Sequence, residues 1–156
     1  SRIKILFVCL GNICRSPAAE AIFKHMVSEK GFSDRVEVDS AGLNGYHDGE
    51  NADPRMIKYA SKRGYRITSI SRRIIPSRDF DYFDLIVGMD DYNYKELIRL
   101  SVPYNATVKV KRMTDFSEIS AATEVPDPYY GGTEGFENVL DILEDCSGGL
   151  LKQITS

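Results

Sequence analysis

The sequence predicts an α/β fold in which a parallel sheet lies between two layers of helices. Residues 5–8 and 85–89 are short, continuous apolar runs rich in strand-forming side chains, which is typical of strands buried on both faces of a parallel sheet. A helical pattern follows each run, and strands that alternate with helices favour a parallel sheet covered on both sides. At 156 residues, the chain is long enough for one domain, residues 1–156, with a sizeable core.

The helices follow from capping residues, apolar periodicity and stop signals. Asp53 is the expected N-cap of the second helix, and Gly64 is its stop. The pair Gly148-Gly149 is expected to weaken the last helix and to end or kink it. Helices are expected over residues 17–30, 54–63, 91–101 and 133–154.

Two further strands are expected, over residues 36–40 and 107–110. Lys109 and Lys111 flank the end of the second of these, and such lysines suit a strand at the edge of a sheet. Residues 67–76 are β-branched and basic without a clear period, so they are expected to be irregular or weakly extended.

The composition is ordinary for a soluble globular domain, with 28% charged and 42% hydrophobic residues. No apolar run approaches the length that spans a membrane, and no signal peptide pattern precedes the first strand. Three cysteines are an odd number for a disulfide scaffold, so a reducing, cytoplasmic setting is expected. The sequence pI of about 5.4 lacks the basic character typical of nucleic-acid binding, so neither nucleic acid nor a membrane is an expected partner.

Residues 8–17 carry the strongest indication of chemistry. They join a buried strand to a helix through a tight loop. Backbone N–H groups in such a loop can converge on an oxyanion, while the helix N-terminus adds positive partial charge. Ser16 is the expected N-cap of the helix, and Pro17 suits its first turn. Residues 9–16 are termed the anion loop, and we expect them to bind phosphate.

Cys9 and Arg15 stand at the two ends of the anion loop, with five residues between them. Arg15 carries a planar guanidinium that matches phosphate oxygens. The positive environment of the loop would keep Cys9 as a thiolate. A thiolate beneath a bound phosphate, with an arginine beside it, is suited to nucleophilic phosphoryl transfer. The alternative is a buried structural cysteine with a surface arginine.

The anion loop and its flanking elements resemble those of the low-molecular-weight protein tyrosine phosphatases, on the run Cys9-Leu10-Gly11-Asn12-Ile13-Cys14-Arg15-Ser16. The resemblance covers essentially the whole chain. It implies a four-stranded, flavodoxin-like parallel sheet. It also implies hydrolysis of phosphotyrosine and small aryl phosphates through a cysteinyl-phosphate intermediate, without a cofactor or a metal. Cys9 and Arg15 would be catalytic, and the phosphate would be bound by Leu10, Gly11, Asn12, Ile13, Cys14, Arg15 and Ser16.

A second informative stretch surrounds Asp127, which lies between Pro126 and Pro128. Both prolines restrict the backbone, so the carboxyl group is expected on a stiff loop. Release of a tyrosine phenolate needs a proton, and a fixed carboxylic acid can supply it. The resemblance implies this role for Asp127. It also implies that the substrate slot is lined by Tyr46, His47, Tyr129 and Tyr130. The alternative is a proline-rich turn with two packing tyrosines.

Two further residues are expected to support the anion loop. The resemblance implies that Ser40 hydrogen-bonds to it, partly through Asn12, and that Asp90 orients Arg15. Each could instead have a local role, Ser40 as a turn serine and Asp90 as the N-cap of the next helix. Ser69 stands where mammalian members of the family carry a histidine that braces the loop, so the strength of that bracing is open.

Two other functions fit part of the pattern. An arsenate reductase of the same fold would share the loop from Cys9 to Arg15, but it needs a downstream pair of redox cysteines. Only Cys146 follows the loop here. A non-catalytic phosphotyrosine-binding module would require neither Cys9 nor Asp127. The expected partners are therefore a phosphotyrosine-containing protein and phosphate or other inhibitory oxyanions.

Overall fold

The computed structural model describes residues 2–156, with the backbone alone for residue 130. Its centre is a four-stranded parallel sheet in the order β2-β1-β3-β4, which confirms the predicted fold class. β1 and β3 are the two central strands, and apolar side chains dominate both because both sheet faces are covered. The strands are β1 (Ile3–Cys9), β2 (Val36–Gly42), β3 (Leu85–Gly88) and β4 (Val110–Arg112).

Side chains of β1 alternate between the two faces of the sheet, and each face has its own core. Ile5 and Phe7 belong to one core, whereas Leu6 and Val8 belong to the other. A strand that supplies two cores needs apolar residues at consecutive positions, which explains the uninterrupted run in the sequence. Cys9 is the last residue of β1 and belongs to the same core as Ile5 and Phe7.

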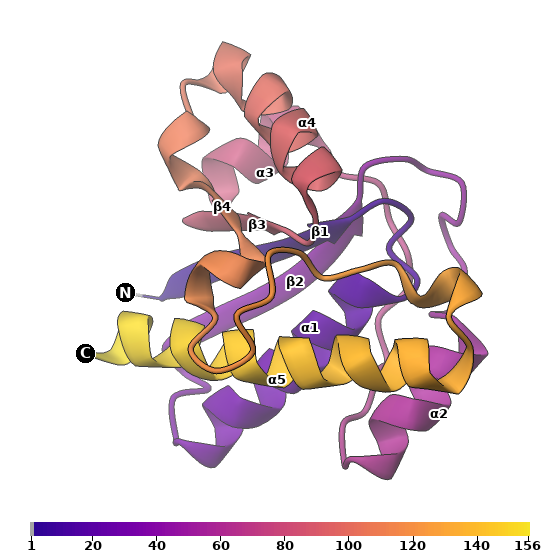
Figure 1. The fold of residues 1–156 in the computed structure, drawn as a ribbon. Helices are drawn as coiled ribbons and strands as arrows, with labels where there is room; N and C mark the ends of the chain where they lie inside the picture. The colour runs from indigo at the N-terminus through magenta and orange to yellow at the C-terminus, as the bar shows by residue number, and fades with distance from the viewer. Residues whose placement is uncertain (1) are drawn as a thin grey trace.

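Three helices cover this first face. Figure 1 shows α1 and α5 passing beneath the sheet, with α2 at the side of α5. Phe136 and Leu140 of α5 are fully buried in the first core. Asp53 is the N-cap of α2, as predicted, because its carboxylate accepts hydrogen bonds from the backbone N–H groups of Arg55 and Met56. The helices are α1 (Arg15–Glu29), α2 (Pro54–Lys62) and α5 (Gly132–Thr155).

Two helices, α3 (Pro76–Tyr82) and α4 (Asp91–Ser101), cover the opposite face (Figure 1). Phe80 of α3 and Leu97 of α4 are buried in the second core. The sequence pattern predicts α4 but not α3, since seven residues are too few to display a helical period. Within residues 2–156, no helix is both long enough and apolar enough to cross a membrane.

The edge strand begins later in the sequence than predicted. Residues 107–109 form a 3₁₀ turn, and β4 begins only at Val110, where pairing with Ile86 of β3 starts. The edge position itself is confirmed, because β4 is the last strand of the sheet. Residues 67–75 are irregular apart from isolated bridges at Ile70 and Arg73, as expected, whereas residue 76 already begins α3. The 3₁₀ helices are Val102–Tyr104, Thr107–Lys109, Met113–Phe116 and Pro128–Tyr130.

Gly148 and Gly149 do not end α5, which is continuous from Gly132 to Thr155. Gly149 faces the 3₁₀ helix Met113–Phe116, and a Cβ at this position would collide with the carbonyl oxygen of Phe116. Gly148 has open space where its Cβ would lie. The prediction of a break is therefore wrong at this pair, and the close approach of the Phe116 backbone explains the glycine at position 149.

This contrast gives a prediction for two neighbouring substitutions. We expect Gly149→Ala to lower the free energy of unfolding by about 1–3 kcal/mol, because the added methyl group overpacks the contact with Phe116. Gly148→Ala should raise it by about 0.5–1 kcal/mol, because alanine is favoured over glycine inside a helix. Urea unfolding of both variants measures the difference, and equal changes would contradict the packing role of Gly149.

Candidate active site

The anion loop leaves β1 at Cys9 and enters α1 at Arg15. The helix begins two residues earlier than predicted, and its N-cap is Cys14, so the prediction of Ser16 as the N-cap is wrong. Ser16 lies within the first turn and is fully buried. Its hydroxyl is held inside the loop instead of at the helix end, which leaves it available to the neighbouring sulfur.

Ser16 connects the two ends of the anion loop. Its Oγ lies 3.0 Å from Cys9 Sγ and accepts a hydrogen bond of 2.8 Å from Asn12 Nδ2. A second acceptor for the hydroxyl, the carbonyl oxygen of Ala41, is farther away at 3.4 Å. A hydroxyl at this distance from a buried sulfur can donate a hydrogen bond to it.

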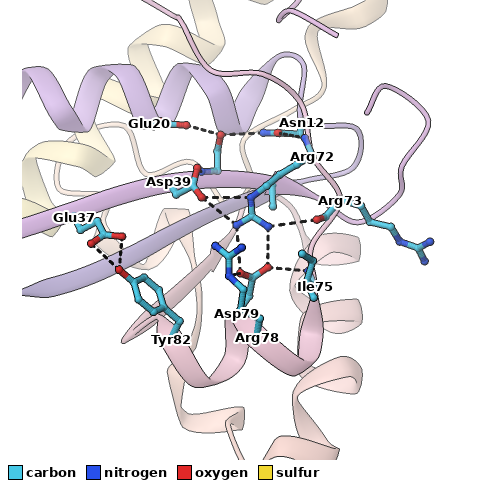
Figure 2. Close-up of polar contacts among 12 residues, drawn as sticks. Asn12, Glu20, Glu37, Asp39, Arg72, Arg73, Ile75, Arg78, Asp79 and Tyr82 are labelled. Atoms are coloured by element: carbon cyan, nitrogen blue, oxygen red, sulfur yellow. Dashed lines mark hydrogen bonds and ion pairs between the residues drawn. The ribbon is translucent and has the colours of Figure 1, made fainter. Parts of the chain in front are cut away.

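Asn12 occupies the centre of the loop with a left-handed backbone, at a φ of 58°. Asparagine tolerates this conformation better than most residues. Ser40 Oγ accepts a 3.0 Å hydrogen bond from Asn12 Nδ2, in agreement with the resemblance. Ser71 Oγ donates to the carbonyl oxygen of Asn12 at 2.5 Å. The backbone N–H of Arg72 donates to Asn12 Oδ1 at 3.1 Å (Figure 2).

Sequence reasoning did not identify two of the loop's supports. Ser71 supplies a hydroxyl contact to the loop from a position two residues beyond Ser69. The buried carboxylate of Glu20 accepts a 2.6 Å hydrogen bond from Ser40 Oγ and a 2.5 Å bond from Lys24 Nζ. Glu20 follows Ser16 by four residues, so both lie on the same face of α1, and this spacing is the signal that could have found it.

Arg15 is almost fully buried, with 3% of its surface exposed. Its Nη1 donates to Asp90 Oδ2 at 2.7 Å and to the carbonyl oxygen of Val125 at 3.1 Å. The other oxygen, Asp90 Oδ1, accepts a 2.7 Å bond from the backbone N–H of Asn93 and caps α4. Asp90 therefore makes both expected contacts, one through each oxygen. Burial alone would lower the pKa of Arg15, but Cys9 and Asp90 outweigh it and raise that pKa above its ordinary value.

Asp127 lies across the cleft from the anion loop, on residues 125–131, here termed the Asp127 loop. Its Oδ2 is 3.9 Å from Arg15 Nη2, and its Oδ1 accepts a 3.0 Å hydrogen bond from the backbone N–H of Tyr129. The Asp127 side chain is 53% exposed, so it faces solvent at the mouth of the site. The Arg55 guanidinium lies 5.5 Å from the ring centroid of Tyr129.

A cleft of about 340 Å³ lies above the anion loop. Its floor includes Cys9 and Arg15, and Asp127 stands at its rim. Three of the predicted slot residues, Tyr46, His47 and Tyr129, also line it. The side chain of Tyr130 lies outside the described part of the structure. The other lining residues are Leu10, Gly11, Ile13, Cys14 and Asn44, whereas the side chains of Asn12 and Ser16 are buried behind the loop.

The remaining two cysteines differ from Cys9 in their surroundings. Burial, with the nearby charge of Asp53 adding to it, raises the pKa of Cys14 far above its ordinary value. Cys146 is buried in α5 among core residues, and burial raises its pKa to about 12. Among the side chains that the structure describes, no cluster of three His, Cys, Asp or Glu residues could hold a metal ion.

Comparisons with a family profile, with related sequences and with solved structures agree with one another. The profile of the family described as low molecular weight phosphotyrosine protein phosphatase matches residues 4–156. A low molecular weight phosphotyrosine protein phosphatase of Drosophila melanogaster is 44% identical over 151 residues, with 96% of each chain covered. A low molecular weight protein-tyrosine-phosphatase of Streptomyces coelicolor is 40% identical, covering 97% of this chain and 93% of the relative. The crystal structure of an Entamoeba histolytica protein tyrosine phosphatase, with Hepes in its active site, superposes with a TM-score of 0.95. Its sequence is 48% identical, and the match covers 98% of this chain and 97% of that chain.

The two roles of Asp90 can be separated by substitution. Asp90→Asn keeps an oxygen that can cap α4 but turns an amide group toward Arg15, whereas Asp90→Ala removes both contacts. We expect both variants to weaken binding of inorganic phosphate by about tenfold or more, since a hydrogen bond between charged groups contributes roughly 1.5–3 kcal/mol. Only Asp90→Ala should also lose the cap, about 1 kcal/mol of unfolding free energy. Calorimetric phosphate titration and urea unfolding test this, and unchanged phosphate affinity in both variants would contradict the orienting role.

Proposed function

Because the chain belongs to the low molecular weight phosphotyrosine protein phosphatase family, we propose that it hydrolyses phosphotyrosine in proteins with Cys9 as the nucleophile. A single observation carries this proposal: Cys9, Arg15 and Asp127 line one cleft, although Asp127 lies more than a hundred residues away in the sequence. These are a nucleophile, an anion-binding group and an acid, the three groups that phosphate ester hydrolysis through a covalent intermediate requires.

In the first step, the Cys9 thiolate attacks phosphorus in line with the leaving phenolic oxygen. The hydroxyl of Ser16, 3.0 Å from the sulfur, supports the thiolate by donating a hydrogen bond. The product of this step is a cysteinyl phosphate. In the second step the S–P bond breaks, and the same hydroxyl stabilises the departing thiolate.

The phosphate oxygens are held by the backbone N–H groups of residues 10–16 and by the guanidinium of Arg15. Asp90 occupies Nη1 of Arg15, and this contact fixes the plane of the guanidinium before the substrate arrives. A fixed set of donors around the transferring phosphoryl group lowers the barrier, because no reorganisation is needed as charge develops in the transition state.

Asp127 is the proposed general acid and base. It protonates the tyrosine oxygen as the P–O bond breaks, and it then accepts a proton from the water that attacks the cysteinyl phosphate. Its exposure at the rim of the cleft supports this role, since the leaving group and the water must both pass there. Oδ1 accepts the hydrogen bond from Tyr129 N–H, whereas Oδ2 lies 3.9 Å from Arg15 Nη2, too far for a hydrogen bond, so Oδ2 is the oxygen proposed to carry the proton.

The shape of the cleft supports an aryl phosphate as substrate. Tyr46 and Tyr129 stand at its sides, and a planar phenyl ring can stack between aromatic walls while its phosphate reaches the loop. The Hepes bound in the active site of the Entamoeba relative is a sulfonic acid, so phosphate and similar oxyanions are the proposed inhibitors.

The two alternative functions receive less support. Cys146 is a buried residue of α5 that does not line the cleft, so it is not placed to act with Cys9 as an arsenate reductase would require. A phosphotyrosine-binding module without turnover would gain nothing from a carboxyl group at the leaving-group side of the cleft. Turnover of an aryl phosphate in the absence of added metal separates these functions from the proposed one.

The nucleophile is tested by Cys9→Ser. We expect this variant to lose turnover of phosphotyrosine peptides yet to bind phosphate or vanadate in calorimetric titration, because the loop amides and Arg15 are unchanged. Cys146→Ala is the control for loss of a buried thiol outside the cleft and should retain turnover. Turnover comparable to that of the wild type in Cys9→Ser would refute the covalent mechanism.

The acid is tested by Asp127→Asn on substrates with different leaving groups. We expect a loss on the order of 10²–10⁴-fold for phosphotyrosine, the usual contribution of a general acid, because its phenolate needs a proton. The loss should be smaller in the first step for a nitrophenyl ester, whose leaving group is stable as an anion. An equal loss for both substrates in burst kinetics would show that Asp127 is structural and that the acid is another group.

A further inference from the structure

We propose that a partly buried ion-pair cluster behind the anion loop holds the loop in its anion-binding shape. The cluster consists of Asp39, Arg72 and Asp79 and is termed the Arg72 cluster. The inference rests on the proposed function, in which this loop binds the transferring phosphoryl group. Arg72 and Asp79 are then positioning residues, which act on the reaction through Asn12 without touching the substrate.

The guanidinium of Arg72 is clamped between β2 and α3, as Figure 2 shows. Its Nη1 and Nη2 donate to the two carboxylate oxygens of Asp79 at 3.0 and 3.3 Å. Its Nε and Nη2 donate to Asp39 Oδ2 at 3.3 and 3.1 Å. Two carboxylates therefore fix the orientation of one planar group, and a guanidinium matches this arrangement through its fork of donors.

The backbone on either side of this clamp contacts the anion loop. Arg72 N–H donates to Asn12 Oδ1, and Ser71 Oγ donates to the Asn12 carbonyl oxygen. The carbonyl oxygen of Arg72 accepts a 2.8 Å bond from the N–H of Gly42, at the end of β2. Residues 71 and 72 are thus held between the sheet and the loop, and the clamped side chain prevents them from moving away.

Asn12 needs this support because its backbone conformation is unfavourable for a residue with a side chain. A left-handed φ is stable only where the surroundings impose it. The amide of Asn12 is held at both ends, at Oδ1 by Arg72 and at Nδ2 by Ser16 and Ser40. Since Ser16 contacts Cys9, a continuous series of contacts runs from Asp79 through Arg72 to the nucleophile.

Asp79 also has a local role, which the test must separate from the proposed one. Its carboxylate is fully buried and accepts a 2.8 Å bond from the N–H of Ile75, at the start of α3. Arg78 approaches the same carboxylate from the exposed side, with its Nε 3.7 Å from Oδ1. A purely structural role would require Asp79 to hold α3 in place without any effect on the anion loop.

The central variant is Asp79→Asn, which keeps an acceptor for Ile75 N–H but removes the charge that clamps Arg72. We expect phosphate affinity and kcat/KM for an aryl phosphate to fall on the order of 10- to 100-fold, a magnitude typical of slight misplacement of catalytic groups. Hydrogen exchange should increase in the peptide that covers residues 9–16. Arg72→Lys keeps the charge but not the fork, so its losses should be smaller than those of Arg72→Met.

Arg78→Ala is the matched control, because it removes a contact with the same carboxylate but leaves the clamp intact. It should leave phosphate affinity, kcat/KM and exchange unchanged. The inference is overturned if Asp79→Asn keeps wild-type phosphate affinity, or if exchange rises only in α3 or uniformly across the chain. A wild-type protein that binds phosphate but does not hydrolyse aryl phosphates would refute the proposed function alone, since binding and exchange are measured without turnover.

Discussion

Asn12 holds a left-handed backbone in the middle of the anion loop, and the arrangement of the site depends on keeping it there. This one conformation turns the chain from the end of β1 into the start of α1 within a few residues, so that Cys9 and Ser16 come within 3.0 Å of each other. Asn12 is contacted by segments distant in the sequence, through Ser40 on β2 and Ser71 in the connection to α3. The geometry of the anion loop therefore depends on contacts with distant segments as well as on its own residues.

The topology of the sheet then places the other groups. β1 and β3 are adjacent and parallel, so the loops that follow them meet at the same edge, where ligands bind in folds of this class. Arg15 comes from the first of these loops and Asp90 from the second, which explains a 2.7 Å contact across 75 residues of sequence. Asp90 caps α4 with one oxygen and faces Arg15 with the other, so the helix end and the guanidinium are oriented by a single side chain.

Features encoded by neighbouring residues could be predicted from the sequence, whereas features that depend on a distant partner could not. The central strands, the Asp53 and Asp90 caps and the anion loop belong to the first kind. The burial of Ser16 inside the loop and the role of Gly149 belong to the second. Serine is a common N-cap residue, but the hydroxyl of Ser16 contacts the sulfur of Cys9, at the end of the preceding strand, instead of capping the helix. From the sequence alone, Gly149 indicates a helix break. The structure shows that glycine is needed there because the backbone of Phe116 leaves no room for a side chain.

The carbonyl oxygen of Val125 accepts a hydrogen bond from Arg15, and the N–H of the same residue donates to the carbonyl oxygen of Met89 at the end of β3. The base of the Asp127 loop is thereby attached to the same guanidinium that faces the cleft. The anion-binding guanidinium proposed for the site and the loop that carries Asp127 are therefore linked through one residue. An anion that strengthens the Arg15–Val125 bond also orders the Asp127 loop, and by thermodynamic reciprocity an ordered Asp127 loop increases anion affinity by the same factor.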